Sequence, residues 1–85
     1  MLARMLTRDD ELAVAIVGHS DNQGGLALNL DLSQRRAEAV MQALIDRGVP
    51  PGQLEARGIA YLAPVASNAT EEGRAQNRRV ELVLR

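Results

Sequence analysis

The apolar positions of the 85-residue chain repeat with different periods, and each period predicts one kind of element. Residues 12–17 are apolar at every position, which is typical of a strand buried on both faces, so we expect a central strand there. Residues 33–47 repeat apolar side chains at intervals of three and four. They predict an amphipathic helix with Ser33 as its N-cap and Gly48 as its stop.

The remaining patterns complete a small α/β sandwich with helices packed on a sheet. Residues 79–85 alternate and predict a strand that is better covered on one face, that of Val80, Leu82 and Leu84. Residues 54–61 contain Gly58 and indicate a weaker strand at a sheet edge. We also expect the end of a helix at 1–6, polar loops at 18–31 and 64–70, and a short exposed helical turn at 71–77.

A chain of this length has room for one domain, spanning residues 1–85. The chain opens on a helix with no strand before it. We therefore expect residues 1–11 to be the remnant of a first helix, in a domain trimmed at its N-terminal side, and residues 12–85 to form the core. No apolar run reaches the roughly 18–20 residues that cross a bilayer, and the first residues lack the pattern of a secretory signal.

Composition argues against several functions. The chain has no cysteine, so it offers neither a disulfide nor a thiolate nucleophile nor a cysteine-based metal site. His19 is the one histidine, and we expect it to be a hydrogen-bonded structural residue rather than a metal ligand. Ten arginines against eleven acidic residues give a net charge of -1, which argues against binding nucleic acid or anionic lipid through bulk charge. Glu71 and Glu72 lie together on a polar turn where both stay solvated, so we expect no catalysis and no cofactor.

Two charged side chains can instead form a binding site. Asp21 follows the expected central strand, and Arg36 lies in the first turn of the expected helix, roughly 110° from the centre of its apolar face. Arg35 lies roughly 150° away and faces water. In one cleft, Asp21 would bind the ammonium and Arg36 the carboxylate of a zwitterionic ligand, with the positive end of the helix dipole assisting. The alternative is an ion pair between Asp21 and Arg36 that closes the loop onto the helix.

A second pair of arginines precedes the last expected strand. Either Arg78 or Arg79 can approach the same cleft, because successive residues of a strand point to opposite faces. The alternative is that both are solvated side chains beside a sheet edge.

Several separated motifs follow one another along the chain: Gly18-His19-Ser20-Asp21-Asn22-Gln23-Gly24, Asn29, Leu32-Ser33-Gln34-Arg35-Arg36-Ala37-Glu38-Ala39-Val40, Gly58, Pro64, Asn68 and Gly73-Arg74-Ala75-Gln76-Asn77-Arg78-Arg79-Val80-Glu81. These motifs, in this order, resemble the OmpA-like C-terminal domain, a family that includes the periplasmic domain of OmpA, the Pal lipoprotein and the MotB stator domain. The resemblance covers nearly the whole chain from about Leu12 onward.

The resemblance implies helices on a small mixed sheet that lacks the family's first strand. It also implies non-covalent binding of peptidoglycan through the diaminopimelate of its stem peptide. Carried over by position, Asp21 engages the ligand's ammonium and Arg36 its carboxylate, while Ser20, Asn29 and Arg78 line the pocket. The family usually has threonine at the position of Ser20, and both residues offer a hydroxyl.

The same resemblance implies a place in the periplasm, at the outer membrane of a bacterial cell envelope, where the domain anchors a parent protein to the cell wall. Nucleic acid is not an expected partner, and any contact with a membrane would come through a missing upstream segment of the parent. The absent first strand would leave a sheet edge unpaired, so a homodimer through that edge is a further expectation. The alternative function is a structural or dimerisation module that has lost ligand binding.

Overall fold

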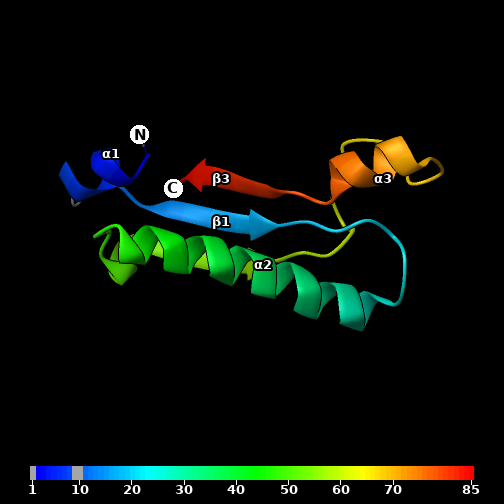
Figure 1. Ribbon diagram of the computed structural model, residues 1–85, viewed down its shortest axis with the longest axis horizontal. Helices are drawn as coiled ribbons and strands as arrows, with labels where there is room; N and C mark the ends of the chain where they lie inside the picture. The colour runs from blue at the N-terminus through cyan, green and yellow to red at the C-terminus, as the bar shows by residue number, and fades with distance from the viewer. Residues whose placement is uncertain (1, 9–10) are drawn as a thin grey trace.

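The computed structural model describes residues 2–8 and 11–85, and within them three α-helices and one turn of 3₁₀-helix accompany a three-stranded sheet (Figure 1). The elements are α1 (Leu2–Arg8), β1 (Val14–Gly18), α2 (Leu26–Asp46), η1 (Pro51–Gln53), β2 (Leu54–Gly58), α3 (Glu71–Asn77) and β3 (Val80–Leu84). No helix of these ranges combines the length and the apolarity needed to span a membrane. The α/β class expected from the sequence is confirmed.

The sheet has the order β2-β1-β3, with β1 parallel to β2 and antiparallel to β3. This mixed arrangement confirms the central strand and places the strand of residues 54–61 at an edge. In the register, Ile16 of β1 stands beside Ala56 of β2 and Leu82 of β3. The side chains of these three residues therefore share one face of the sheet.

Helix α2 covers that face and encloses a small core (Figure 1). Ile16 and Val14 of β1 are almost fully buried against it, and Ala37 of α2 is fully buried. Leu6 of α1 is also fully buried in this core, so α1 belongs to the same packed unit. The expected helix at the start of the chain is thus observed at Leu2–Arg8, and residues 1, 9 and 10 lie outside the described residues.

Helix α2 begins earlier than the sequence indicated. Its first residue is Leu26, after Gly25 at the N-cap, so the expected loop over residues 18–31 ends at Gly25. Ser33 is not the N-cap but a buried residue of the third turn. Its hydroxyl donates to the Leu30 carbonyl at 3.1 Å and accepts from the Ala60 amide at 3.0 Å. The expected end of the helix is confirmed at Asp46.

Two glycines let α2 lie close to the ends of the parallel strands. A Cβ on Gly18 would overlap the backbone carbonyl of Ser33, and a Cβ on Gly58 would overlap the backbone of Gln34. Any other residue at these positions would push the helix away from the sheet. The contact sets the distance between the strand ends and the part of α2 that carries Arg36.

The last strand is less covered than the sequence indicated. Val80 is half-buried, but Leu82 and Leu84 on the same face remain 48% and 57% exposed. The reason is that α2 packs mainly on β1 and β2. The prediction that this face of β3 is the better covered one is therefore wrong for Leu82 and Leu84.

Candidate functional site

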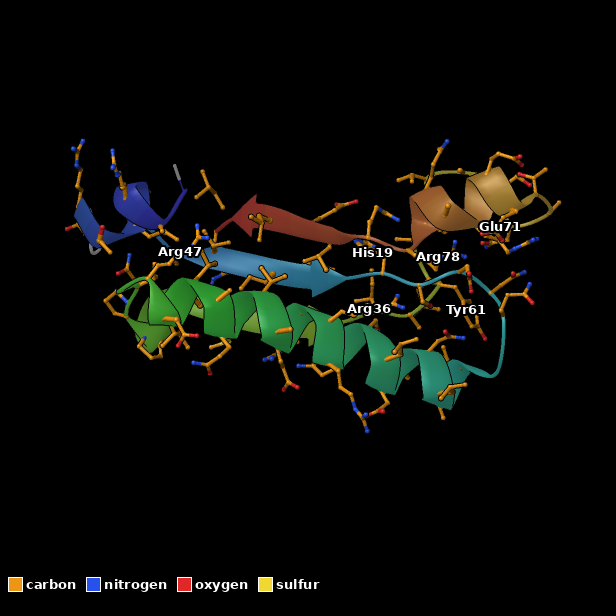
Figure 2. The ribbon with its side chains drawn as sticks, in the orientation of Figure 1. His19, Arg36, Arg47, Tyr61, Glu71 and Arg78 are labelled. Atoms are coloured by element: carbon orange, nitrogen blue, oxygen red, sulfur yellow. The ribbon has the colours of Figure 1, made fainter. Side chains whose placement is uncertain are left out.

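Charged side chains gather at the end of the sheet where β1 and β2 finish (Figure 2). His19, Arg36, Glu71 and Arg78 all lie at this end, whereas Arg47 lies at the other end of α2. The carboxyl ends of parallel strands meet at one edge of a sheet, so the segments that leave them are brought together. This end of the molecule therefore holds the candidate site.

Backbone hydrogen bonds hold the segment after β1 in place. The His19 amide donates to the Arg79 carbonyl at 2.7 Å, and the Ser20 amide donates to the Ala60 carbonyl at 2.8 Å. The chain thus stays paired on both sides for two residues beyond the strand. As a result, Asp21 is fixed and buried although it lies outside regular secondary structure.

The carboxylate of Asp21 is hydrogen-bonded through both oxygens. Oδ1 accepts from the Gln23 amide at 3.0 Å, and Oδ2 accepts from Nη1 of Arg78 at 2.7 Å. Burial acts to raise the pKa of Asp21, but the Gln23 amide and the Arg78 guanidinium outweigh it, so the pKa is lowered. Asp21 is therefore a fixed anion at neutral pH.

Arg78 bridges two carboxylates. Its Nη2 donates to Oε1 of Glu71 at 2.7 Å while Nη1 binds Asp21. The hydrogen bonds to Glu71 and Asp21 raise the pKa of Arg78 and, in turn, the hydrogen bond from Arg78 lowers the pKa of Glu71. Glu71 also accepts from Arg74 at 3.2 Å. Arg78 is therefore held with its guanidinium spread between α3 and the loop after β1.

The role of Glu71 was missed in the sequence, where it was expected to be solvated with Glu72. Its side chain is indeed 63% exposed, yet it binds two arginines. The signal that could have found it is the spacing of Glu71, Arg74 and Arg78, at intervals of three and four along one helical face.

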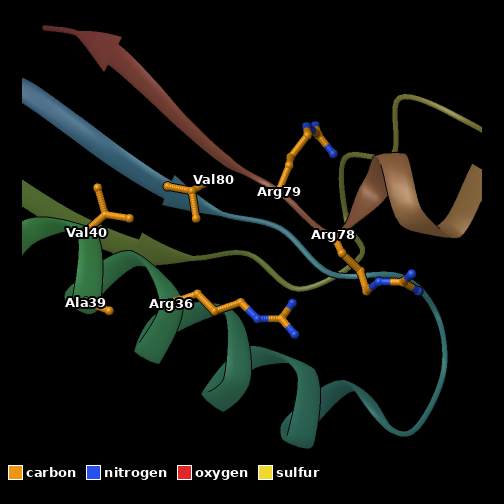
Figure 3. A pocket seen from close by; sticks show the side chains of 6 residues that line it. All are labelled: Arg36, Ala39, Val40, Arg78, Arg79 and Val80. Carbon is orange, nitrogen blue, oxygen red and sulfur yellow. The ribbon is translucent and has the colours of Figure 1, made fainter.

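A cavity of about 450 Å³ opens between α2 and the start of β3. It is lined by Arg36, Ala39, Val40, Arg78, Arg79 and Val80 (Figure 3). The side chains of Arg36 and Arg78 extend toward the same end of this cavity, whereas the side chain of Arg79 extends away from Arg36. Of the two arginines considered from the sequence, Arg78 is thus the one whose guanidinium lies on the side of Arg36.

Arg36 sits on the third turn of α2, not on the first as expected, because the helix starts at Leu26. At 1.5 Å per residue, the N-terminus of the helix lies about 15 Å from Arg36 along the axis, too far for its dipole to assist there. Arg35 faces water, 73% exposed and paired with Asp31, as expected. Arg36 is half-buried at the boundary, also as expected.

Asp21 and Arg36 are not paired with each other. Asp21 binds Arg78 instead, and within residues 2–8 and 11–85 no hydrogen bond or ion pair involves the Arg36 guanidinium. The ion pair considered as an alternative is therefore absent from the described chain. Arg36 presents an uncompensated positive charge to the cavity, and Arg78 connects that cavity to Asp21.

Arg79 also lines the cavity, but its guanidinium pairs with Glu81 and takes no part in the contacts among Asp21, Glu71 and Arg78. Nε of Arg79 donates to Oε1 of Glu81 at 2.6 Å, and Nη2 donates to the Ala63 carbonyl at 3.0 Å. The hydrogen bond from Arg79 lowers the pKa of Glu81. These contacts hold the Arg79 guanidinium away from Arg36.

His19 is buried, but its ring is not hydrogen-bonded, contrary to the expectation from the sequence. Neither ring nitrogen has a hydrogen-bond partner among the residues that the structure describes, and Nε2 lies 3.6 Å from Oε1 of Glu81. Burial and the positive charge of Arg79 lower the pKa of His19, with Glu81 opposing them in part.

A metal site was not expected from the sequence. Among the residues that the structure describes, no cluster of three or more histidine, aspartate or glutamate side chains is arranged to hold a metal ion.

Ser20 and Asn29 shape the loop after β1. The Ser20 hydroxyl donates to the Asp21 carbonyl at 2.9 Å. The Asn29 amide group donates to the carbonyls of Gln23 at 2.7 Å and Gly25 at 3.1 Å, which ties the loop to the first turn of α2. Both side chains are almost fully buried. Their observed contacts are with the protein backbone.

The described chain is a mixed α/β unit with an arginine-lined cavity at one end of its sheet, and comparisons with known proteins place it in a class. The chain matches the OmpA family over residues 1–78. It is 45% identical over 83 residues to the probable lipoprotein YiaD of Escherichia coli, covering 98% of this chain and 38% of YiaD. It is 46% identical over 71 residues to the peptidoglycan-binding protein ArfA of Mycobacterium tuberculosis, covering 84% of this chain and 22% of ArfA. The chain thus spans less than half the length of these two relatives.

The fold is shared with solved structures. The peptidoglycan-associated lipoprotein from Burkholderia pseudomallei superposes with a TM-score of 0.96 at 39% identity, covering 99% of this chain and 71% of that chain. The cell wall anchor of the T6SS from Pseudomonas aeruginosa gives a TM-score of 0.80 at 40% identity, covering 95% and 59%. The chain belongs to the OmpA family, as the sequence motifs indicated.

Proposed function

We propose that this chain is a peptidoglycan-binding module of the bacterial cell envelope, which anchors a parent protein at the outer membrane to the cell wall in the periplasm. Similarity to proteins named as peptidoglycan-binding or peptidoglycan-associated supports the ligand class. Similarity to outer-membrane lipoproteins supports the location. The specific ligand proposed is the diaminopimelate of the stem peptide.

The observation that carries this proposal is the free guanidinium of Arg36. In the described chain it has no acidic partner, and it faces a cavity of about 450 Å³ next to Arg78. A positive charge held at a boundary position without a counter-ion is suited to an anion from outside. A planar guanidinium binds a carboxylate through two parallel hydrogen bonds, which favours this anion.

The second charge of the ligand is assigned to Asp21. A diaminopimelate side chain ends in a carbon that carries both an ammonium and a carboxylate. With the carboxylate on Arg36 and beside Arg78, the ammonium would join Arg78 at Oδ2 of Asp21. A carboxylate oxygen accepts more than one hydrogen bond, so Arg78 and the ligand can share it.

Three further residues support the proposed site. Arg78 contributes to the carboxylate end, and Ser20 and Asn29 hold the loop that presents Asp21. The proposed activity is binding alone, because the groups in the site are permanently charged arginines and a carboxylate that stays ionised.

The test is co-sedimentation of the chain with purified sacculi that contain diaminopimelate. We expect the unmodified chain to sediment with the sacculi and Arg36→Ala to stay in solution. Arg35→Ala is the matched control, because it removes a neighbouring arginine that faces water. Equal binding by Arg36→Ala and the unmodified chain, with both folded by circular dichroism, would contradict the proposed site.

A further inference from the structure

The loop between β2 and α3 carries the one aromatic side chain of the protein, that of Tyr61. Tyr61 is half-buried, yet it is not among the residues that form the hydrophobic core or pack against it. Its hydroxyl has no hydrogen-bond partner in residues 2–8 and 11–85. An aromatic ring is the side chain that a small core could use best, since it buries about 150–250 Å². The ring of Tyr61 is instead half open to solvent.

Two neighbours of Tyr61 are open to solvent as well. Leu62 is 65% exposed and Val65 is 61% exposed, and no large apolar side chain of the described residues is more exposed than Leu62. Residues 59–70 also contain no charged side chain, although a quarter of the chain is charged. Tyr61, Leu62 and Val65 therefore make a neutral and largely apolar part of the surface, which we call the Tyr61 surface.

Hydrogen bonds fix both ends of this loop. The Ala60 amide donates to the Ser33 hydroxyl at 3.0 Å, and the Ala60 carbonyl accepts from the Ser20 amide at 2.8 Å. Ala60 has a φ of 55°, a left-handed conformation that costs free energy in any residue but glycine and persists where its surroundings impose it. At the other end, the Val65 amide donates to Oδ1 of Asn77 at 2.8 Å. The Tyr61 surface is thus held in one arrangement, and a ligand would bind it at little cost in conformational entropy.

The Tyr61 surface lies close to the proposed ligand site. Tyr61 and Arg78 are found at the same end of the sheet (Figure 2). Tyr61 follows Ala60 and Asp21 follows Ser20, and the backbones of Ala60 and Ser20 are joined by the hydrogen bond of 2.8 Å. Consecutive Cα atoms are about 3.8 Å apart and paired backbones about 5 Å apart, so the Cα atoms of Asp21 and Tyr61 lie within roughly 13 Å of each other. A molecule held at Asp21 can therefore extend onto Tyr61.

We infer that the Tyr61 surface binds an N-acetylated amino sugar of the glycan strand whose stem peptide is held at Asp21. This inference rests on the peptidoglycan binding proposed above. One face of such a sugar ring carries mainly C–H groups and can lie flat on an aromatic ring, while the tyrosine hydroxyl can bond to a sugar hydroxyl. The methyl of the N-acetyl group can pack against Leu62 or Val65. The sugar ring is uncharged, as is the loop.

The length of the stem peptide agrees with this placement. Two residues and a lactyl ether separate diaminopimelate from the sugar, and an extended chain of that length covers roughly 10 Å or slightly more. The rest of the stem fits the Tyr61 surface less well. The D-glutamate between diaminopimelate and the sugar carries a carboxylate, and residues 59–70 offer it no cationic side chain. The terminal D-alanines are apolar, so the test uses a stem that lacks them.

The test compares a disaccharide tripeptide, which ends at diaminopimelate, with the same tripeptide without its sugars. We expect calorimetric titration to show that the unmodified chain binds the disaccharide tripeptide at least threefold more tightly. In Tyr61→Ala this advantage should disappear while the affinity for the free tripeptide stays unchanged, which also shows that the variant is folded. Tyr61→Phe keeps the ring and should keep most of the advantage. Val83→Ala, which shortens a half-exposed apolar side chain of β3, is the control and should bind both ligands like the unmodified chain.

A second measurement follows the ring itself. The chain has one tyrosine, no phenylalanine and no tryptophan, so Tyr61 shares the aromatic side-chain signals of a proton NMR spectrum with His19 alone. We expect the disaccharide tripeptide to shift the ring signals of Tyr61, and the sugar protons to move upfield in the complex because they lie over the ring. The free tripeptide should leave the ring signals of Tyr61 nearly unchanged.

The outcomes separate sugar binding from the proposed function. Equal affinity of the unmodified chain for the two ligands would overturn sugar binding and leave the diaminopimelate site intact. An equal loss of affinity for both ligands in Tyr61→Ala would overturn it too, because Tyr61 would then act on the peptide. No binding of either ligand by the unmodified chain would overturn the peptidoglycan function, and sugar binding with it.

Discussion

Nη1 of Arg78 lies 2.7 Å from Oδ2 of Asp21, and this ion pair joins two segments that are 57 positions apart. It fixes the direction of the carboxylate at the end of the central strand. It also keeps the pKa of Asp21 low against the opposing effect of burial. The proposed acceptor for the ligand's ammonium is therefore charged and oriented before any ligand arrives.

The first prediction concerns the charge of Asp21. Asp21→Asn keeps the shape of the side chain but removes its charge, so the hydrogen bond to an ammonium becomes much weaker. We expect affinity for diaminopimelate-containing muropeptides to fall roughly tenfold to a hundredfold, the equivalent of a charged hydrogen bond of about 1.5–3 kcal/mol. Asp31→Asn, on the exposed face of α2, is the control and should bind like the unmodified chain. Calorimetric titration would show the difference.

The second prediction concerns the pH dependence of stability. His19 is buried beside Arg79, and both burial and this charge lower its pKa in the folded state. The unfolded chain, with an ordinary pKa near 6.5, then binds more protons than the folded chain below that pH. The free energy of unfolding should therefore fall as the pH is lowered from about 7.5 to 5.5, by no more than about 1.4 kcal/mol for each pH unit.

This dependence is measured as the shift of the urea midpoint between the two pH values. His19 is the chain's one histidine, so His19→Asn should remove most of the slope whatever it does to stability itself. A slope of equal size in His19→Asn would assign the effect to another group.

The third prediction concerns the close contact of α2 with the sheet. In Gly18→Ala the new methyl group would overlap the Ser33 carbonyl, and the helix would have to move. We expect a loss of about 1–3 kcal/mol in the free energy of unfolding. Gly52→Ala places its methyl group in open space and should change stability by less than about 0.5 kcal/mol. Chemical denaturation of both variants makes the comparison, and equal midpoints would contradict the packing.

The fourth prediction separates loop support from direct ligand contact. Asn29→Ala removes the side-chain donor of the Gln23 carbonyl, at a cost of about 1–3 kcal/mol, whereas the Gly25 carbonyl keeps its hydrogen bond from the backbone amide of residue 29. We expect faster hydrogen exchange in residues 20–25 together with weaker ligand binding. Weaker binding with unchanged exchange in this loop would instead show that Asn29 acts on the ligand itself.

Much of the fold was accessible from the sequence because periodicity and glycine mark it. The uninterrupted apolar run predicted the central strand, and Gly48, which adopts a φ of 96°, marked the end of α2. The first half of α2 was missed because its leucines recur at every second position, from Leu26 to Leu32. This half extends beyond the strands, and Leu28 is 62% exposed, so burial imposes no helical period there (Figure 1).

The site was accessible in part. Position on the expected elements, and the resemblance, singled out Asp21 and Arg36, and helical geometry placed Arg36 at the boundary of the buried face. The link through Arg78 could not be found from spacing, because it depends on how α3 packs against the loop after β1. The contacts of Ser20 and Asn29 with the backbone could not be found from spacing either, because they depend on the path of that loop.

The most direct test of the two-charge site compares two muropeptides that differ by one carboxylate. A stem peptide with diaminopimelate carries an ammonium and a carboxylate at the end of that side chain, whereas one with lysine carries the ammonium alone. We expect the unmodified chain to bind the diaminopimelate form at least tenfold more tightly, and Arg36→Ala to bind both forms equally weakly. Equal affinity of the unmodified chain for the two muropeptides would contradict the account.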